Sequence, residues 1–212
     1  MNSMEEINLR IESEYCSDTT EKLTDEHLLE SYKNQPSVKT KINRYSTVFR
    51  NHNIDERTIE SIIKELMPDL VPPGTKGSIR GNKFNQIVKE YIENMMLDPD
   101  LYEICFEKKH ISYITSENPD FYILHKETNR IIIGMNQVDL WNGGQQINRG
   151  YKYICDNKMN TNNCKFLCVV CNKTWFRSIK NKSYELFRIG FGNNTLCYLK
   201  NLENIIKSFF QI

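Results

Sequence analysis

Side chains that can do chemistry gather between Glu117 and Ile154. The Pro119-Asp120 pair puts a carboxylate where a strand is expected to begin, directly after a proline, which cannot donate a backbone hydrogen bond within a sheet. On the next apolar segment, the alternation of a strand places Gln137 and Asp139 on one face. Polar groups are costly to bury without partners, so several of them where an apolar strand ends indicate a functional site.

Periodicity predicts the elements that must position these side chains. Apolar residues recur at helical spacing over residues 81–96, which predicts a helix that packs its stripe into the core. The segment 125–130 is typical of a hairpin turn, so the strands on either side of it should be antiparallel neighbours. The expected fold class is α/β around one mixed sheet, with strands at 102–106, 121–125, 130–140, 166–170 and 195–199 and further helices at 145–154 and 202–209.

A strand that opens with Pro119-Asp120, then a hairpin, then a hydrophobic strand that ends in polar residues, resembles the PD-(D/E)XK nuclease superfamily of most type II restriction endonucleases. The resemblance covers about residues 78–171 and implies a restriction-endonuclease-like mixed sheet flanked by helices. In that family the aspartate and an acidic residue on the next strand hold a divalent metal, and a lysine two positions further on orients or deprotonates the attacking water. A helix before the sheet sometimes adds a carboxylate, and here its counterpart offers Lys83, Asn85, Gln86 and Glu90.

The second half of the family pattern is altered in this chain. If Gln137 takes the lysine position, Met135 stands where the acid should be. Alternatively, Asp139 is the acid and Gln137 its neighbour on the same face, in the reverse order. Both registers stay open. Because glutamine cannot take a proton, the base would be another water molecule or the substrate phosphate.

The resemblance implies a Mg²⁺-dependent, sequence-specific endonuclease that hydrolyses phosphodiester bonds in double-stranded DNA. Asp120 and Asp139, with Glu117, would bind the metal, and Gln137 joins the two aspartates as a candidate catalytic residue. The metal would lower the pKa of a bound water molecule and offset the charge that develops on the phosphate. A homodimer follows from the family, since cutting both strands of a palindrome requires two-fold symmetry. The structural alternative is that Asp139 ends a strand and Asp120 anchors a turn.

The segment after this strand is expected to contact DNA. Polar side chains occupy one face of the helix expected at 145–154, and apolar ones occupy another. Asparagine and glutamine can pair with adenine and arginine with guanine, and basic side chains contact phosphates. The alternative is an ordinary amphipathic helix with a solvated face. The candidate DNA-binding residues are Arg80, Lys83, Asn142, Gln145, Gln146, Asn148, Arg149 and Lys152.

Composition and charge agree with a globular protein that binds a polyanion. The chain has 212 residues, 39% hydrophobic and 26% charged, with a net charge of +1. Residues 1–30 carry nine acidic and two basic side chains, a net charge of −7, so the other 182 residues carry +8. No apolar run approaches the roughly 18 residues of a membrane helix. The N-terminus also lacks the layout of a secretion signal. We therefore expect a soluble, intracellular protein with no membrane partner.

The seven cysteines are expected to be reduced thiols. Cys155, Cys164, Cys168 and Cys171 lie close together in the sequence, but their spacing fits no common zinc site. Two of them also fall in a segment that is typical of a buried strand. We interpret them as apolar core residues.

The chain is expected to have two parts, an acidic extension or helical arm over 1–50 and a nuclease-like α/β domain over 51–212. Within the second part, a helix is expected from Asp55 until Pro68 ends it, followed by a turn-rich loop over 70–81. Two other functions remain open. One is a non-catalytic DNA-binding module on a decayed nuclease fold, suggested by the missing lysine. The other is a repair or recombination nuclease that acts on branched or single-stranded DNA.

Overall fold

A computed structural model describes residue 19 and residues 21–108, 118–138, 151–155, 161–171 and 182–212. The chain divides into two compact units. One is the helical unit, residues 20–83. The other, the sheet unit, consists of the described residues of Phe84–Ile212 together with Thr19.

The helical unit is built from α3 (Leu29–Lys33), α4 (Pro36–Asn51), α5 (Glu56–Leu70) and the first part of α6 (Pro73–Glu93). The Asp55 carboxylate caps α5 by accepting a hydrogen bond from the backbone N–H of Thr58 at 3.0 Å. An apolar stripe at helical spacing buries α5 against α3 and α4. The core is formed by Leu28, Tyr32, Val38, Ile59, Ile63, Met67, Leu70 and Val71.

Several expected boundaries in this part of the chain differ from the structure. The helical unit continues to residue 83 rather than ending near residue 50, because α5 shares its core with α3 and α4. The expectation that Pro68 ends the helix was wrong: α5 continues to Leu70, whose side chain is buried in that core.

The turn-rich loop expected over 70–81 was also wrong, because α6 begins at Pro73. A proline suits the first turn of a helix, where backbone N–H groups have no partner inside the helix. The other end of α6 comes earlier than expected, at Glu93 instead of residue 96. Met96 has a left-handed backbone with φ of 51° and is 88% exposed.

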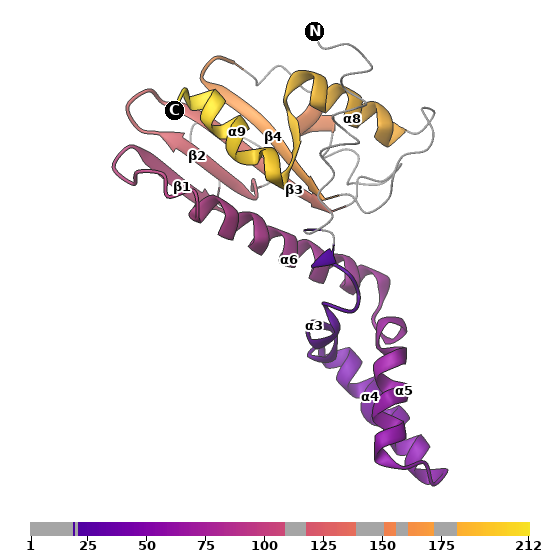
Figure 1. Cartoon of the computed structure of the whole chain (residues 1–212). Helices are drawn as coiled ribbons and strands as arrows, with labels where there is room; N and C mark the ends of the chain where they lie inside the picture. Colours follow the sequence, from indigo (N-terminus) through magenta and orange to yellow (C-terminus); the bar gives the residue numbers. More distant parts are fainter. Residues whose placement is uncertain (1–18, 20, 109–117, 139–150, 156–160, 172–181) are drawn as a thin grey trace. The chain divides into compact units, whose positions relative to one another are not determined.

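The sheet unit contains five strands in the order β1-β2-β3-β4-β5. The first three pair antiparallel, whereas β3, β4 and β5 run parallel, so the sheet is mixed and the α/β class is confirmed (Figure 1). The hairpin expected between the second and third strands is confirmed as well. The strands are β1 (Tyr102–Phe106), β2 (Phe121–His125), β3 (Arg130–Val138), β4 (Cys164–Cys171) and β5 (Leu196–Tyr198).

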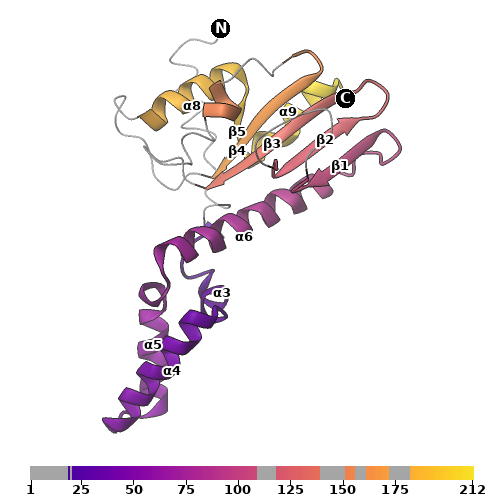
Figure 2. The same cartoon turned by 180° about the vertical axis from the view of Figure 1, so that it is seen from behind.

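Helices cover both faces of the sheet. On one face, Ile131, Ile133 and Met135 of β3 pack in a core with the π-helix η1 (Tyr151–Cys155) and with α8 (Lys182–Asn193). On the other face lies α9 (Leu199–Phe210), in front of the strands in Figure 1 and behind them in Figure 2. Alternation along the strands therefore decides which helix each side chain meets. Within the described parts of the chain, no helix combines the length and apolar character needed to cross a membrane.

The sequence did not lead us to expect α8. Its close packing depends on Gly190, where an added Cβ would lie 2.4 Å from the Cβ of Leu196 on β5. The closing helix was expected and is confirmed, but it begins at Leu199, directly after a β5 of three residues. Of the helix expected at 145–154, only η1 falls among the described residues.

Candidate functional site

Three elements of the sheet unit meet at the carboxylate of Asp120, which directly precedes β2. Its Oδ2 accepts a hydrogen bond from the backbone N–H of Asn136, near the end of β3, at 2.6 Å. Its Oδ1 accepts one from Nδ2 of Asn85, on α6, at 3.4 Å. The triangle closes because Asn136 Nδ2 donates to Asn85 Oδ1 at 3.1 Å. A helix and two strands thus fix one acidic side chain.

The backbone of Asp120 is held from both sides. Its N–H donates to the carbonyl of Gly134 at 3.0 Å, and its carbonyl accepts from the N–H of Glu107 at 3.0 Å. The neighbouring Phe121 lies opposite Gly134, with its ring only 2.1 Å from where a Cβ on that glycine would stand. A glycine is therefore required there for β2 to approach β3 and carry Asp120 to its partners.

Asn136 leaves one oxygen available in this cluster. The residue is 9% exposed, and its Oδ1 is buried with no hydrogen-bond partner among the described residues. A buried acceptor without a partner costs about 1–3 kcal/mol. An amide oxygen is also a hard ligand of the kind that Mg²⁺ and Ca²⁺ accept. Because Asn136 also bonds the Asp120 carboxylate through its backbone N–H, its unpaired oxygen is a suitable position for a cation or a polar ligand.

Gln137 and Met135 face away from Asn136, because successive residues of a strand point to opposite sides of the sheet. Met135 is fully buried in the core that β3 shares with η1 and α8. Gln137 is 6% exposed, and its Nε2 donates to the carbonyl of Val138 at 3.1 Å. The described partners of the Asp120 carboxylate are Asn85 and Asn136.

Most of the other candidate residues lie outside the described part of the chain. This holds for two proposed metal ligands and five proposed DNA contacts: Glu117, Asp139, Asn142, Gln145, Gln146, Asn148 and Arg149. Lys152 belongs to η1, but its side chain is not described. Arg80 and Lys83 are half-buried residues of α6 in the part that belongs to the helical unit. The register that uses Asp139 therefore falls outside the described residues, whereas Met135 and Gln137, which the other register uses, face away from Asn136.

The residues present fit a partial Mg²⁺ site. No three His, Cys, Asp or Glu side chains within the described ranges come together as a metal-binding group. The donor set there consists of the Asp120 carboxylate and the Asn136 amide oxygen. Mg²⁺ usually keeps several waters and binds proteins through one or two carboxylates, so such a set suits it if one more acidic residue joins.

The cysteines offer no alternative metal centre in the described residues. Cys164, Cys168 and Cys171 are buried in β4, and Cys155 is half-buried in η1. Burial raises the pKa of the Cys155 thiol, and the nearby Glu185 raises it further. A raised pKa keeps the thiol neutral, as expected of a core residue rather than a thiolate ligand.

Asn136 is the site residue that sequence reasoning left out of the candidate site. Its polar type at the end of an apolar strand was the available signal, but the alternation expected from the sequence grouped Gln137 with Asp139, and the assignment followed that pair. Asn85 was a candidate only as the counterpart of a family carboxylate. What joins the two asparagines to Asp120 is the packing of α6 on the sheet, which no local pattern contains.

Comparison of the chain with protein-family models, with curated proteins and with solved structures gives no match, so the functional argument rests on the residues and their geometry.

Proposed function

We propose that this protein is a metal-dependent DNA endonuclease of the restriction type, with Asp120 at its active site. The observation that carries the proposal is the convergence of α6, the start of β2 and the end of β3 on that carboxylate. A helix, a strand opened by Pro-Asp and the strand that follows it are the three parts that the resemblance to PD-(D/E)XK nucleases leads us to expect around the metal.

Asp120 and Asn136 would hold Mg²⁺ from the described part of the site, and Asp139 and Glu117 are the acidic residues proposed to complete the set. Asp139 follows β3 directly, so its part in the site requires that the alternation of the strand ends at Val138. When bound, the ion supplies Lewis-acid stabilisation of the phosphate and a bound water of lowered pKa. The chain's own task is orientation. Asn85 and the backbone of Asn136 fix the Asp120 carboxylate, so little reorganisation is required when the substrate binds.

The proton of the attacking water needs an acceptor other than an amide. Asn85, Asn136 and Gln137 all carry amides, which cannot act as general bases at neutral pH. We therefore propose that the proton passes to a second water molecule or to a phosphate oxygen of the DNA. A nuclease without a basic residue at the family's lysine position should cleave DNA slowly, because a positioned general base raises the reaction rate by about 10²–10⁴-fold.

Double-stranded DNA is the proposed partner, and a homodimer the proposed assembly for cutting both strands. The candidate contacts are the polar and basic residues of α6 and of the segment that follows β3: Arg80, Lys83, Asn142, Gln145, Gln146, Asn148, Arg149 and Lys152. Binding through lysine and arginine releases counterions from DNA, so the affinity should fall steeply as salt is raised.

A second function, a DNA-binding module without catalysis, is favoured by one specific observation. Asn85 bonds the Asp120 carboxylate through its side chain, Asn136 bonds it through its backbone N–H, and the two asparagine side chains bond each other, whereas the family pattern has acidic or basic groups around this carboxylate. A cluster of one carboxylate and two amides can be stable without a metal, because most of its donors and acceptors satisfy one another.

Incubation of the full chain with supercoiled plasmid in Mg²⁺ or Mn²⁺ separates these functions. The endonuclease proposal predicts discrete fragments, lost in Asp120→Asn and retained in Asp100→Asn, which removes an exposed carboxylate elsewhere in the sheet unit. Binding of duplex DNA with no cleavage in either metal would contradict the nuclease and favour the binding module. Cleavage restricted to branched or single-stranded DNA would instead indicate a repair or recombination enzyme.

A further inference from the structure

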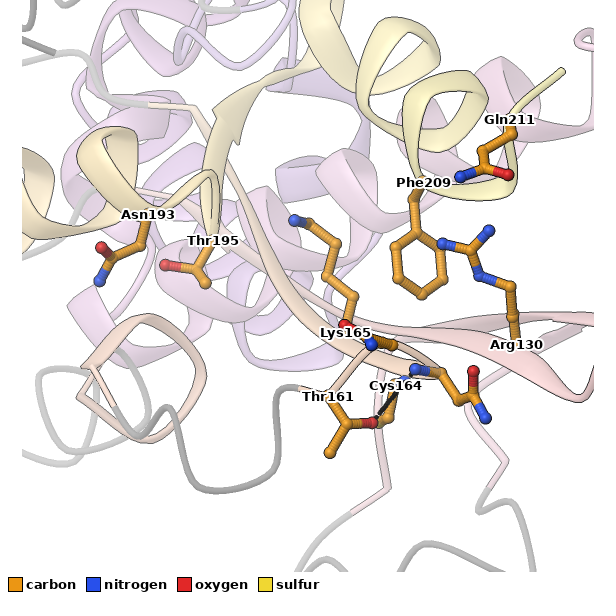
Figure 3. Close-up of a pocket in the computed structure, with 10 residues that line it drawn as sticks. Arg130, Thr161, Cys164, Lys165, Asn193, Thr195, Phe209 and Gln211 are labelled. Carbon is orange, nitrogen blue, oxygen red and sulfur yellow. Dashed lines mark hydrogen bonds between the residues drawn. The ribbon is translucent and has the colours of Figure 1, made fainter. Parts of the chain in front are cut away.

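Figure 3 shows a polar cavity of about 710 Å³ at the start of β3, whereas Asp120 bonds Asn136 near the end of that strand. Arg130, the first residue of β3, and Lys165, the second of β4, line it together with Phe209 of α9. Asn136 stands six residues along β3 from Arg130, a separation of about 20 Å at 3.3 Å per residue. This cavity, the β3-start pocket, is therefore separate from the candidate active site.

Two cations enter the pocket on the face of the sheet that α9 covers. The Arg130 guanidinium stacks on the Phe209 ring, with its Cζ 4.6 Å from the ring centroid. The Lys165 ammonium lies 6.0 Å from the same centroid, and Figure 3 shows both side chains beside the ring. The negative face of the aromatic ring attracts both positive charges, and this attraction offsets part of their mutual repulsion.

Neither cation is neutralised within the described residues. The ion pairs found there join other residues, and the Nε of Arg130 is buried without a hydrogen-bond partner in that part of the chain. Burial lowers the pKa of Lys165 from its ordinary value, although the nearby Cys197 opposes that change. A buried charged donor without a partner is costly, so both groups would gain from an anion.

The rest of the lining supplies neutral polar groups. Asn163 and Asn193 are exposed at the rim and present amides that can donate hydrogen bonds. The Thr195 hydroxyl already donates to the carbonyl of Ile154 at 2.8 Å, so it is left as an acceptor for a ligand. The volume falls within the range of about 300–1,000 Å³ typical of small-molecule sites, more than a lone phosphate fills.

We propose that the β3-start pocket binds a small phosphorylated molecule, with its phosphate between Arg130 and Lys165. A phosphate ester carries nearly two negative charges and three acceptor oxygens, so it can receive a fork of two N–H donors from arginine and one from lysine at once. A single carboxylate would leave part of that donor set unused. The inference does not depend on the proposed nuclease function, because it uses none of the residues around Asp120.

Isothermal titration calorimetry of the full chain with inorganic pyrophosphate and with adenosine monophosphate tests the proposal, in buffer containing a chelator so that no metal contributes. We expect saturable binding that weakens at least ten-fold in both Arg130→Gln and Lys165→Met. Lys39→Gln, which removes an exposed charge from α4, and Asp120→Asn should bind like the unchanged protein. Melting curves identify a pocket variant that fails to fold, and in that case the binding of the other pocket variant decides the outcome.

Absence of binding by both probes would overturn the proposal, as would binding that neither pocket variant weakens. A third titration, with a short DNA duplex, distinguishes a free phosphate ester from a backbone phosphate. If Arg130→Gln and Lys165→Met weaken duplex binding while neither small probe binds, the pocket is a DNA contact and the small-molecule proposal fails. Binding of the probes in a protein that does not cut plasmid would leave this proposal standing and remove only the nuclease.

Discussion

At the scale of single residues, Gly134 decides whether Asp120 can reach its partners. An alanine there would place its Cβ within the Phe121 ring, so β2 and β3 would have to separate. We predict that Gly134→Ala costs about 1–3 kcal/mol of unfolding free energy, as overpacked cores do. Gly77→Ala on α6 is the matched control, because its Cβ would meet nothing within 4 Å and should stabilise the helix by up to about 1 kcal/mol. Urea denaturation measures both, and equal effects would contradict the packing argument.

Asn85 offers a second test at this scale, because it bonds both other members of the cluster. Asn85→Leu would leave Asp120 Oδ1 and Asn136 Nδ2 without this partner. We predict a loss of about 1–3 kcal/mol. Gln86→Leu, the next residue along α6, removes an exposed amide bonded to Glu90 and should change stability by less than about 0.5 kcal/mol. If the two substitutions prove equivalent in thermal and urea unfolding, the cluster has no structural role.

The burial of Lys165 affects the stability of the protein both without and with its proposed ligand. Burial lowers the pKa of this lysine, so the folded protein holds that proton less tightly than the unfolded chain and the charge opposes folding at neutral pH. Lys165→Met should therefore raise the melting temperature of the ligand-free protein slightly, by the equivalent of up to about 1 kcal/mol. The same change should reduce the stabilisation that pyrophosphate gives. A marked loss of stability without ligand would mean that the charge has an internal partner.

At the scale of elements, α5 stays helical through a proline because its apolar side chains pack in the core of the helical unit. Pro68 lacks the N–H that a helix requires, and a proline in a helix interior costs about 3 kcal/mol. Proline also restricts the unfolded chain, and the smaller loss of conformational entropy on folding offsets about 0.4–1 kcal/mol of that cost. We predict that Pro68→Ala stabilises the helical unit by about 2–3 kcal/mol. Pro36→Ala, at the first turn of α4, should instead destabilise it slightly. Circular dichroism melting compares the two, and a destabilised Pro68→Ala would be inconsistent with this account.

Elements with a strong local pattern were predictable from the sequence, and those held by distant packing were not. The β2–β3 hairpin follows from apolar alternation on both sides of a short polar turn, and α9 follows from its apolar stripe. In α8 the core residues Leu186, Phe187 and Phe191 lie among polar residues and two glycines, which conceal the helical period. Its stability comes from packing on the sheet, which overrides weak local propensity.

The candidate site divides in the same way. The Pro119-Asp120 pair was visible in the sequence because proline marks the mouth of a strand. Its bond to Asn85 joins residues 35 positions apart, and Asn136 bonds Asn85 across 51 positions. Contacts over such separations depend on where α6 crosses the sheet. A periodic pattern reports which face of an element is buried but not which residue of a distant element it meets.

At the scale of the whole molecule, each unit has an apolar core of its own, and each should contribute its own free energy of unfolding. The candidate active site and the β3-start pocket both belong to the sheet unit, at opposite ends of one strand. A charged group of the helical unit that takes no part in either site, such as Asp25, therefore reports on the stability of that unit alone.

Asp25 provides such a report through the pH dependence of stability. Burial tends to raise the pKa of its carboxyl, but hydrogen bonds from Tyr32 at 2.7 Å and from Lys76 at 3.3 Å outweigh that effect and lower it. A lowered pKa in the folded state stabilises the helical unit above the ordinary aspartate value near 3.9, and that stabilisation disappears as the pH falls through the folded pKa. Asp25→Asn should thus cost about 0.5–1 kcal/mol at pH 7, modest because the side chain is 45% exposed. The difference in stability between Asp25→Asn and the unchanged protein should vanish in melts near pH 2. The control is Asp69→Asn, at an exposed position of α5, which should leave stability unchanged at both pH values. A cost for Asp25→Asn that persists in acid would show that the carboxylate's charge is not what stabilises the helical unit.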